Sequence, residues 1–315
     1  MDRALILHPR IFEPIGWLAA GMTTRFWPAG APNDRRQAMV ARLRDELGLP
    51  NAKIILAEQV HGCDVARVDQ NSTQGDQDLL KARPPFPEVL GPCSTLRIGK
   101  PCFPSSSAGM AGGKQSASMA GGKQSASMAC ALPNETSTNS LPEDEAREIP
   151  GVDALATASP LVLIGVFTAD CVPIALVDPR RRNLAVAHAG REGTRQGIVR
   201  KTVDCLRKMG SAPRDMAAWV GPSICAAHYE VSEEIAAEFR ERFGDKTGAV
   251  TGSEGRHLDL KEIVRRELME CGVDPSRIEV DPRCTLENAD LFYSYRREGA
   301  SAGRMFTFLG IRDAE

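Results

Sequence analysis

Three short apolar runs near the middle of the chain limit most strongly what it can fold into. They are LVLIGVF at 161–167, VPIALVD at 172–178 and NLAVAHAG at 183–190. Runs that are largely apolar throughout, rather than at every second residue, are typical of strands buried on both faces. We therefore expect these three segments to be interior strands.

Helix and strand patterns alternate on either side of these runs. Asn33 or Asp34 can cap a helix that ends at Gly48, and further helices are expected over about 194–209, 232–243 and 259–271, the last with a capping box of Asp259 and Glu262. Strands are expected at 53–60, 216–220, 277–281 and 305–309. The pattern predicts an α/β or α+β fold with layered sheet and helix and one substantial sheet.

One stretch does not share this pattern. Residues 71–150 are rich in Pro, Ser and Gly, and the segment AGGKQSASM at 111–119 is repeated at once at 120–128. A nine-residue unit of small, polar and Met residues offers no apolar face to pack. We expect 71–150 to be a disordered insertion without a chemical role, and 1–315 otherwise to form a single α/β catalytic domain.

Composition excludes several classes of protein. The formal net charge is −2, which argues against a nucleic-acid or membrane-surface partner, and aromatic residues make up only 5% of the chain. The longest apolar stretch, 161–177, contains Thr168, Asp170 and Pro173, so we expect no membrane segment. Nine cysteines, with no two closer than nine positions, are typical of reduced thiols and favour the cytoplasm.

The five histidines leave a short list of possible metal ligands. His61 follows the strand expected at 53–60, and His188 lies near the end of the strand at 183–190, where it is followed by glycine. Cys171 lies in TADCVP, between two expected strands. If the fold brings these three strand ends together, they form a His/Cys/His set with an open fourth position, as in catalytic zinc sites.

Six motifs in order carry a resemblance to a known family. They are GMTTRFWP, EQVHG, FTADCVPIALVD, AVAHAGREGTRQGIV, GPSICAAHYEV and FYSYRREGASAGR, spread from about Gly16 to Gly310. The chain resembles the multicopper polyphenol oxidoreductase or laccase-domain family, read as zinc-dependent purine nucleoside phosphorylases with adenosine deaminase activity. The resemblance implies a layered α/β fold, distantly similar to cysteine-dependent deamidating toxins, and a metal held by His61, Cys171 and His188.

The resemblance also implies substrates, namely phosphate and a purine nucleoside such as adenosine, inosine or methylthioadenosine. Phosphorolysis needs cationic groups that hold phosphate oxygens, and the candidates are Arg25, Arg296 and Arg297. Zinc would lower the pKa of a bound water to about 7 for deamination. A proton relay is then needed, and Asp170, Glu58 and Gln59 are equally open; Asp170 could instead bind a strand-end backbone.

Two motifs depart from the family pattern. Arg191 and Glu192 stand where the family has Trp-Arg, so the role of that family arginine is not carried over. Ala227 and His228 stand where the family has paired cysteines. We interpret His228, together with His8 and His257, as structural.

Other functions fit the same residues. Cys171 as nucleophile with His188 as base would make a cysteine hydrolase or amidase, acting for example on cell-wall precursors. A His₂Cys set also suits copper, but the three remaining histidines are too few for the further cluster of a true laccase. A structural zinc protein would need a fourth ligand, for which Cys63 is the nearby thiol.

Deleting Ser105–Cys130 should leave the fold and the activity near normal, because this segment has no pattern that forms a core. The measurement is the melting temperature of the deletion variant beside that of the full chain, with its enzymatic activity. A large drop in melting temperature would show that the segment is part of the folded protein.

Overall fold

The computed structural model describes residues 6–25, 42–69, 146–244, 250–251 and 255–312. All of these described residues belong to one compact unit. The tandem repeat and most of the expected insertion lie outside the described residues, as do Asn33 and Asp34. Residues 147–150 were expected to belong to the insertion, but they form β5 (Arg147–Pro150), which pairs in parallel with β3 (Lys53–Glu58).

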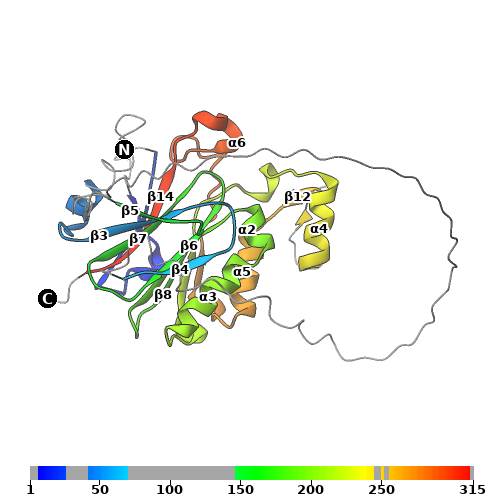
Figure 1. Cartoon of the computed structure of the whole chain (residues 1–315). Coiled ribbons are helices and arrows are strands. Elements are labelled where there is room, and N and C mark those ends of the chain that lie inside the picture. Colours follow the sequence, from blue (N-terminus) through cyan, green and yellow to red (C-terminus); the bar gives the residue numbers. More distant parts are fainter. Residues whose placement is uncertain (1–5, 26–41, 70–145, 245–249, 252–254, 313–315) are drawn as a thin grey trace, which may run out of the picture. The chain divides into compact units, whose positions relative to one another are not determined.

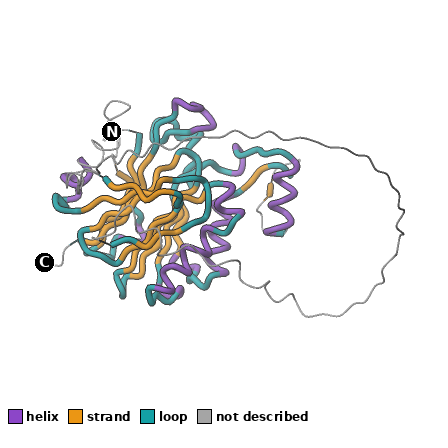
Figure 2. Tube along the Cα trace, in the orientation of Figure 1, coloured by secondary structure: helices purple, strands orange, loops and turns teal. Residues whose placement is uncertain are grey.

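Two six-stranded sheets form the centre of this unit (Figures 1 and 2). The first has the order β1 (Ile6–Leu7), β2 (Leu18–Thr23), β14 (Met305–Ile311), β7 (Val162–Thr168), β3 and β5. The second has the order β13 (Ile278–Val280), β10 (Ala217–Val220), β8 (Val172–Asp178), β9 (Asn183–Ala189), β6 (Ala154–Thr157) and β4 (Val65–Arg67). The expectation of one substantial sheet is therefore wrong.

The two sheets share a core. Ile164 and Leu309 of the first sheet pack in one apolar cluster with Val177, Val186 and Trp219 of the second. The expected strands β7, β8 and β9 are confirmed and nearly completely buried. A sequence pattern shows that a strand is buried on both faces, but it does not show whether a helix or a second sheet covers each face.

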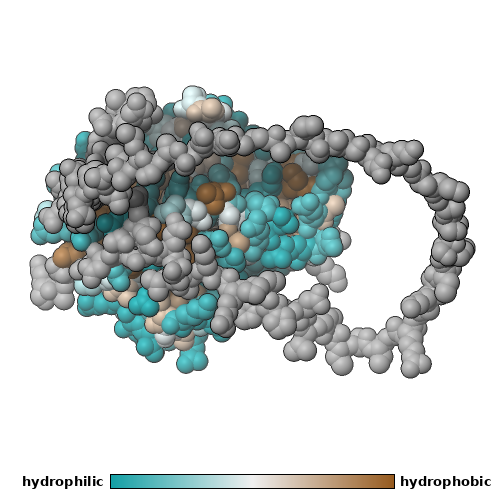
Figure 3. Space-filling view, viewed as in Figure 1, coloured by the Kyte–Doolittle hydropathy of each residue, from teal (hydrophilic) through white to brown (hydrophobic). Residues whose placement is uncertain are grey.

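Helices cover the outer face of the second sheet (Figure 1). They are α3 (Ile198–Lys208), α4 (Glu233–Phe243) and α5 (Leu260–Glu270), and their visible surface is mostly hydrophilic (Figure 3). The predicted N-cap is confirmed, because the Glu262 backbone N–H donates to the Asp259 carboxylate over 3.0 Å. The Glu262 carboxylate pairs with Arg265 and Arg266 instead of completing the capping box. The helix expected over 194–209 is divided into α2 (Arg191–Arg195) and α3 by Gly197, whose φ is 86°.

The remaining elements are short. They are α6 (Tyr295–Glu298), β11 (Val250–Thr251), β12 (His257–Leu258), and the 3-10 turns η1 (Arg10–Phe12), η3 (Pro213–Asp215), η4 (Ala226–His228), η6 (Pro275–Arg277) and η7 (Gly299–Ser301). Residues 42–47 are helical and pack Leu43 and Leu47 on the outer face of the first sheet. Within the described ranges, each helix is too short or too polar to cross a membrane.

Gly165→Ala should destabilise the protein by about 1–3 kcal/mol, the usual range for overpacking a core. A Cβ at Gly165 in β7 would lie 2.0 Å from the ring of Phe306 in β14. The measurement is the midpoint of denaturant unfolding. Gly16→Ala is the matched control, since a Cβ there meets nothing within 4 Å; equal midpoints for the two variants would contradict the prediction.

Candidate metal centre and its pocket

The three expected ligands meet at one place. His61 follows β3 of the first sheet, Cys171 lies where the chain passes from β7 to β8, and His188 belongs to β9 of the second sheet. Their ligand atoms all lie within 4.8 Å of one another. The two imidazole rings contact edge to face, with their centroids 4.9 Å apart. The set can therefore hold a metal ion.

Strand register and two glycines allow this approach. Val172 pairs with Ala189, which places Cys171 beside Gly190. A Cβ at Gly190 would lie 3.3 Å from Cys171 Sγ and 3.4 Å from a carbon of the His61 ring. At Gly193 a Cβ would lie 2.5 Å from the Gly62 carbonyl oxygen. The start of α2 can therefore pack against the His61 loop only because neither position carries a side chain.

A buried carboxylate organises two of the three ligands. Asp153 is fully buried, and its Oδ1 lies 2.8 Å from His188 Nδ1. The same carboxylate accepts the backbone N–H groups of Val60, His61 and Gly62 at 3.2, 3.1 and 2.7 Å. His61 has a φ of 59°, an uncommon value for a residue with a side chain, and these bonds hold it there. Since Nδ1 is bound to Asp153, His188 offers Nε2 as its ligand atom.

Charge is shared between Cys171 and His188. Burial alone would raise the pKa of the Cys171 thiol, but the neighbouring His188 and His61 hold it at about 6. Burial alone would lower the pKa of His188, but the Cys171 thiolate and Asp153 raise it to about 9. A thiolate is the form of cysteine that binds a metal or attacks a carbonyl.

The cluster borders a cavity of about 680 Å³, a volume within the usual range for small-molecule sites. The His61, Cys171 and His188 side chains lie in its wall, together with three arginines, Arg191, Arg296 and Arg304. Two tyrosines also line it. The Arg296 guanidinium lies 5.4 Å from the Tyr229 ring centroid, and that of Arg304 lies 5.9 Å from Tyr295.

The three arginines predicted to bind phosphate differ in whether they face the pocket. Only Arg296 lines the pocket. Arg25 forms an ion pair with Glu298 at 3.6 Å and lies over the Tyr293 ring. Arg297 donates to the carbonyl groups of Thr285, Leu286 and Phe292 over 2.7–3.0 Å, so its guanidinium is committed to the backbone.

The three proton-relay candidates also separate. Asp170 lines the pocket, but its carboxylate already has three protein partners. It accepts hydrogen bonds from the Thr285 hydroxyl at 2.5 Å, the Ser294 hydroxyl at 3.0 Å and the backbone N–H of Arg296 at 2.7 Å. The Gln59 side-chain amide exchanges two 2.7 Å hydrogen bonds with the Phe167 backbone. Glu58 lines the same cavity and is exposed.

Cys63, considered as a fourth ligand, does not belong to this cluster. Its Sγ accepts from Lys201 Nζ at 2.8 Å and lies 3.2 Å from a Gln196 oxygen. The ligand set at this place therefore has three members among the described residues.

Sequence reasoning missed Asp153, Arg304 and the two tyrosines of the pocket. Asp153 immediately precedes the apolar run ALAT, and a carboxylate next to a buried strand was the available signal. Tyr295 is the tyrosine of SYRR and Arg304 ends the motif FYSYRREGASAGR, but the sequence does not show that their side chains face the pocket. Arg191 departs from the family pattern, yet it lines the pocket.

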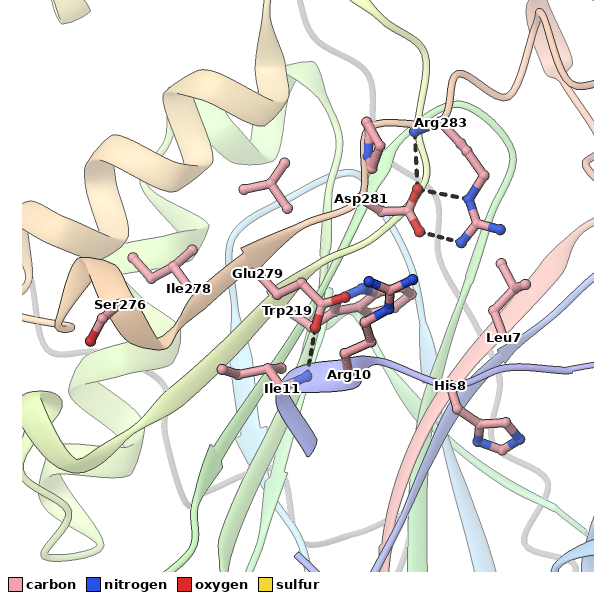
Figure 4. Close-up of a pocket in the computed structure, with 12 residues that line it drawn as sticks. Leu7, His8, Arg10, Ile11, Trp219, Ser276, Ile278, Glu279, Asp281 and Arg283 are labelled. Atoms are coloured by element: carbon pink, nitrogen blue, oxygen red, sulfur yellow. Dashed lines mark hydrogen bonds and ion pairs between the residues drawn. The ribbon is translucent and has the colours of Figure 1, made fainter. Parts of the chain in front are cut away.

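A second cavity, of about 860 Å³, lies between the N-terminal segment and β13 (Figure 4). Here the Asp281 carboxylate pairs with the guanidinium and the backbone N–H of Arg283. Glu279 accepts the Ile11 N–H at 2.6 Å. Because these carboxylates already have protein partners, the chemistry favours the first cavity as the reactive site.

Comparison with known proteins identifies the family of the chain. The family described as multi-copper polyphenol oxidoreductase laccase matches residues 115–312, and the chain belongs to that family. A purine nucleoside phosphorylase of Deinococcus radiodurans is 44% identical over 161 residues, which cover 50% of this chain and 61% of that protein. Adenosine deaminase RL5 of an unknown prokaryotic organism is 34% identical over 168 residues, covering 52% and 64%. The chain thus spans less than two thirds of the length of these relatives.

Solved structures share the fold over nearly the whole chain. YlmD from Geobacillus stearothermophilus has a TM-score of 0.67 and 25% identity, covering 96% of this chain and 94% of that one. The hypothetical protein YfiH of Bacillus licheniformis has a TM-score of 0.68 and 23% identity, covering 99% and 98%. The layered α/β fold implied by the sequence motifs is therefore confirmed.

Asp153→Asn should weaken metal binding at this cluster by about 10–100-fold, the usual effect of losing a partner that orients a ligand. The amide keeps the size of the side chain but loses the charge that holds His188 and the His61 loop. The measurement is competition for zinc with a chromophoric chelator. Asp178→Asn, at the opposite end of β8, is the control because it also removes a buried carboxylate that accepts backbone N–H groups; equal zinc affinities in the two variants would contradict the role of Asp153.

Proposed function

We propose that this protein is a zinc-dependent purine nucleoside phosphorylase with adenosine deaminase activity. The observation that carries the proposal is the position of the His61, Cys171 and His188 cluster, in the wall of a cavity that also presents arginines and tyrosines. The names of the relatives support the same activities.

The donor set fits zinc. Two imidazoles and a thiolate are ligands that zinc prefers, and three protein ligands leave a fourth position for water or substrate. When bound there, zinc lowers the pKa of a water to about 7 and so supplies a nucleophile at neutral pH.

Copper chemistry of the laccase type has less support. The structure describes all five histidines, and they do not gather into one cluster. His8 lines the second cavity, His257 lies in β12, and His228 belongs to a separate group of possible ligands. Oxygen reduction by a laccase would use a further cluster of several histidines.

The chain's own residues can then bind the two substrates. Arg191, Arg296 and Arg304 place positive charge in the pocket, where guanidinium groups can hold phosphate oxygens in fixed geometry. The rings of Tyr229 and Tyr295 offer flat surfaces for a purine. Tyr295 is 55% exposed, whereas most large apolar residues of the described chain are buried or partly buried. We propose phosphate and a purine nucleoside as the substrates, and the protein's own net charge of −2 does not favour a nucleic acid.

We assign proton transfer to Glu58, the pocket carboxylate that has no side-chain hydrogen bond or ion pair within the described part of the chain. Asp170 acts as a positioning residue, because its carboxylate holds the Ser294 and Arg296 segment beside the pocket. We also propose a cytoplasmic location, because the six cysteines within the described ranges are free, as expected in a reducing compartment.

A cysteine hydrolase is the second candidate. Cys171, His188 and Asp153 form a series of nucleophile, base and orienting carboxylate, with the Cys171 pKa at about 6. In this reading His61 is neither the nucleophile nor the base. The two candidates therefore differ in what His61 does.

The test is adenosine turnover by protein purified without added metal, with and without phosphate. We expect adenine only in phosphate and inosine in either buffer. His61→Ala and Cys171→Ala should each lose about one zinc per chain. Their activity should fall by at least 10–100-fold, the usual effect of losing a residue that only hydrogen-bonds to a metal ligand.

The control is His8→Ala, which changes a histidine of the other cavity and should keep both zinc and activity. If His61→Ala loses zinc but still turns over adenosine while Cys171→Ala does not, the zinc mechanism is wrong and Cys171 acts as the nucleophile. Zinc without any nucleoside turnover would also reject the proposed substrates.

A further inference from the structure

A second cluster of metal-ligating side chains lies away from the pocket wall. Cys225 precedes η4, His228 ends it, and Cys284 and Glu287 follow β13. Their ligand atoms all lie within 4.8 Å of one another. The two segments run side by side, because Ser223 and Cys284 form an isolated parallel bridge.

Three of the four known separations agree with those around a four-coordinate ion, and the fourth, between His228 Nδ1 and Cys225 Sγ, is slightly shorter. His228 Nδ1 lies 3.2 Å from Cys225 Sγ and 3.7 Å from Cys284 Sγ. Glu287 Oε1 lies 3.4 Å from the same nitrogen and 3.8 Å from Cys225 Sγ. For tetrahedral zinc with Zn–S bonds of about 2.3 Å and Zn–N or Zn–O bonds of about 2.0–2.2 Å, neighbouring ligand atoms are about 3.4–3.8 Å apart.

A single hydrogen bond at His228 Nδ1 does not account for all the groups that surround this nitrogen. A neutral imidazole nitrogen takes part in one hydrogen bond, yet two sulfurs and a carboxylate oxygen surround His228 Nδ1. Cys284 Sγ also accepts the backbone N–H of Cys225 at 3.3 Å, the kind of outer interaction that stabilises a metal-bound thiolate.

The charges around the cluster also favour a cation. Two thiolates and one carboxylate around a divalent ion leave one negative charge. The buried Lys261 ammonium, close enough to interact with both thiols, offsets it. Lys261 Nζ also donates to the carbonyl oxygens of Asp281 and Arg283, each at 3.1 Å, which fixes the segment that leads into Cys284.

We propose that Cys225, His228, Cys284 and Glu287 bind a structural zinc ion, separate from the one proposed in the pocket. Four protein ligands of this kind make a closed site, which is the form of structural rather than catalytic zinc. Two sulfurs, one imidazole and one carboxylate suit zinc better than magnesium or calcium, which prefer oxygen ligands. The inference does not depend on the nucleoside activity.

The proposed zinc site would stabilise two segments that line the substrate pocket. Thr285, next to Cys284, donates to the Asp170 carboxylate, and the Ile224 N–H, next to Cys225, donates to the Asp170 carbonyl oxygen at 3.0 Å. Ile224 and Tyr229 themselves line the cavity. A zinc ion here would tie together the two segments that carry these contacts.

The experiment is elemental analysis of the full chain in five forms: wild type, Cys225→Ser/Cys284→Ser, His61→Ala, the combination of these two variants, and Cys271→Ser. We expect the cysteine pair variant and His61→Ala each to lose about one zinc per chain, and a combined variant to lose both, because each site binds about one ion. Cys271→Ser is the matched control, since Cys271 is a buried thiol outside both clusters, and it should keep the wild-type zinc content.

Cobalt substitution identifies the ligands independently of activity. The thiolate-to-cobalt charge-transfer absorption should fall more in the cysteine pair variant, which loses two thiolates, than in Cys171→Ser, which loses one. If the cysteine pair variant does not fold, His228→Ala and Glu287→Ala replace it, because both side chains are partly exposed. A wild-type zinc content in folded variants of this cluster, or a disulfide between Cys225 and Cys284 in the purified protein, would overturn the proposal.

Discussion

The buried carboxylate of Asp153 is the contact on which the candidate site depends. It precedes β6 in the second sheet, yet it binds three successive N–H groups of the loop that follows β3 in the first sheet. It also fixes the ring of His188. An unpaired buried carboxylate is costly in free energy. The Asp153 carboxylate therefore keeps the His61 loop and the His188 ring in place together, because both are its hydrogen-bond partners. The uncommon backbone conformation of His61 is stable only within that arrangement.

The packing of two sheets explains why the site lies where it does. The chain leaves the first sheet at β7 and enters the second at β8, so the ADC turn at 169–171 lies at the junction. Gly190 and Gly193 permit the close approach of α2 to that junction. The same segment, through Asp170, is joined to residues 285–296, which carry the pocket arginine Arg296 and connect to the proposed structural zinc site.

Local patterns predicted much of the fold. The structure agrees with expectation for strands β7, β8 and β9, for the cap of α5 at Asp259, and for the proximity of His61, Cys171 and His188. Apolar runs, capping residues and sequence motifs are local signals, so the sequence alone could show them. The division of the strands into two sheets was missed, because an apolar run does not show which sheet a strand joins. The short strands β4 and β6 of the second sheet and β5 of the first were also missed, since they are only three or four residues long. The division of the helix at Gly197 was missed because one glycine inside a helical pattern does not by itself end a helix.

The chain's own residues determined its family, its buried strands and the identity of the three residues that meet in the pocket, because these follow from chemical type and order along the sequence. Only the tertiary structure decided which arginines face the pocket. Arg25 and Arg297 look the same as Arg296 in a sequence, but backbone carbonyls and Glu298 occupy them. The tertiary structure alone also brought Cys225 and His228 to Cys284 and Glu287, because ligands almost 60 positions apart meet only through the packing of strands from distant parts of the chain.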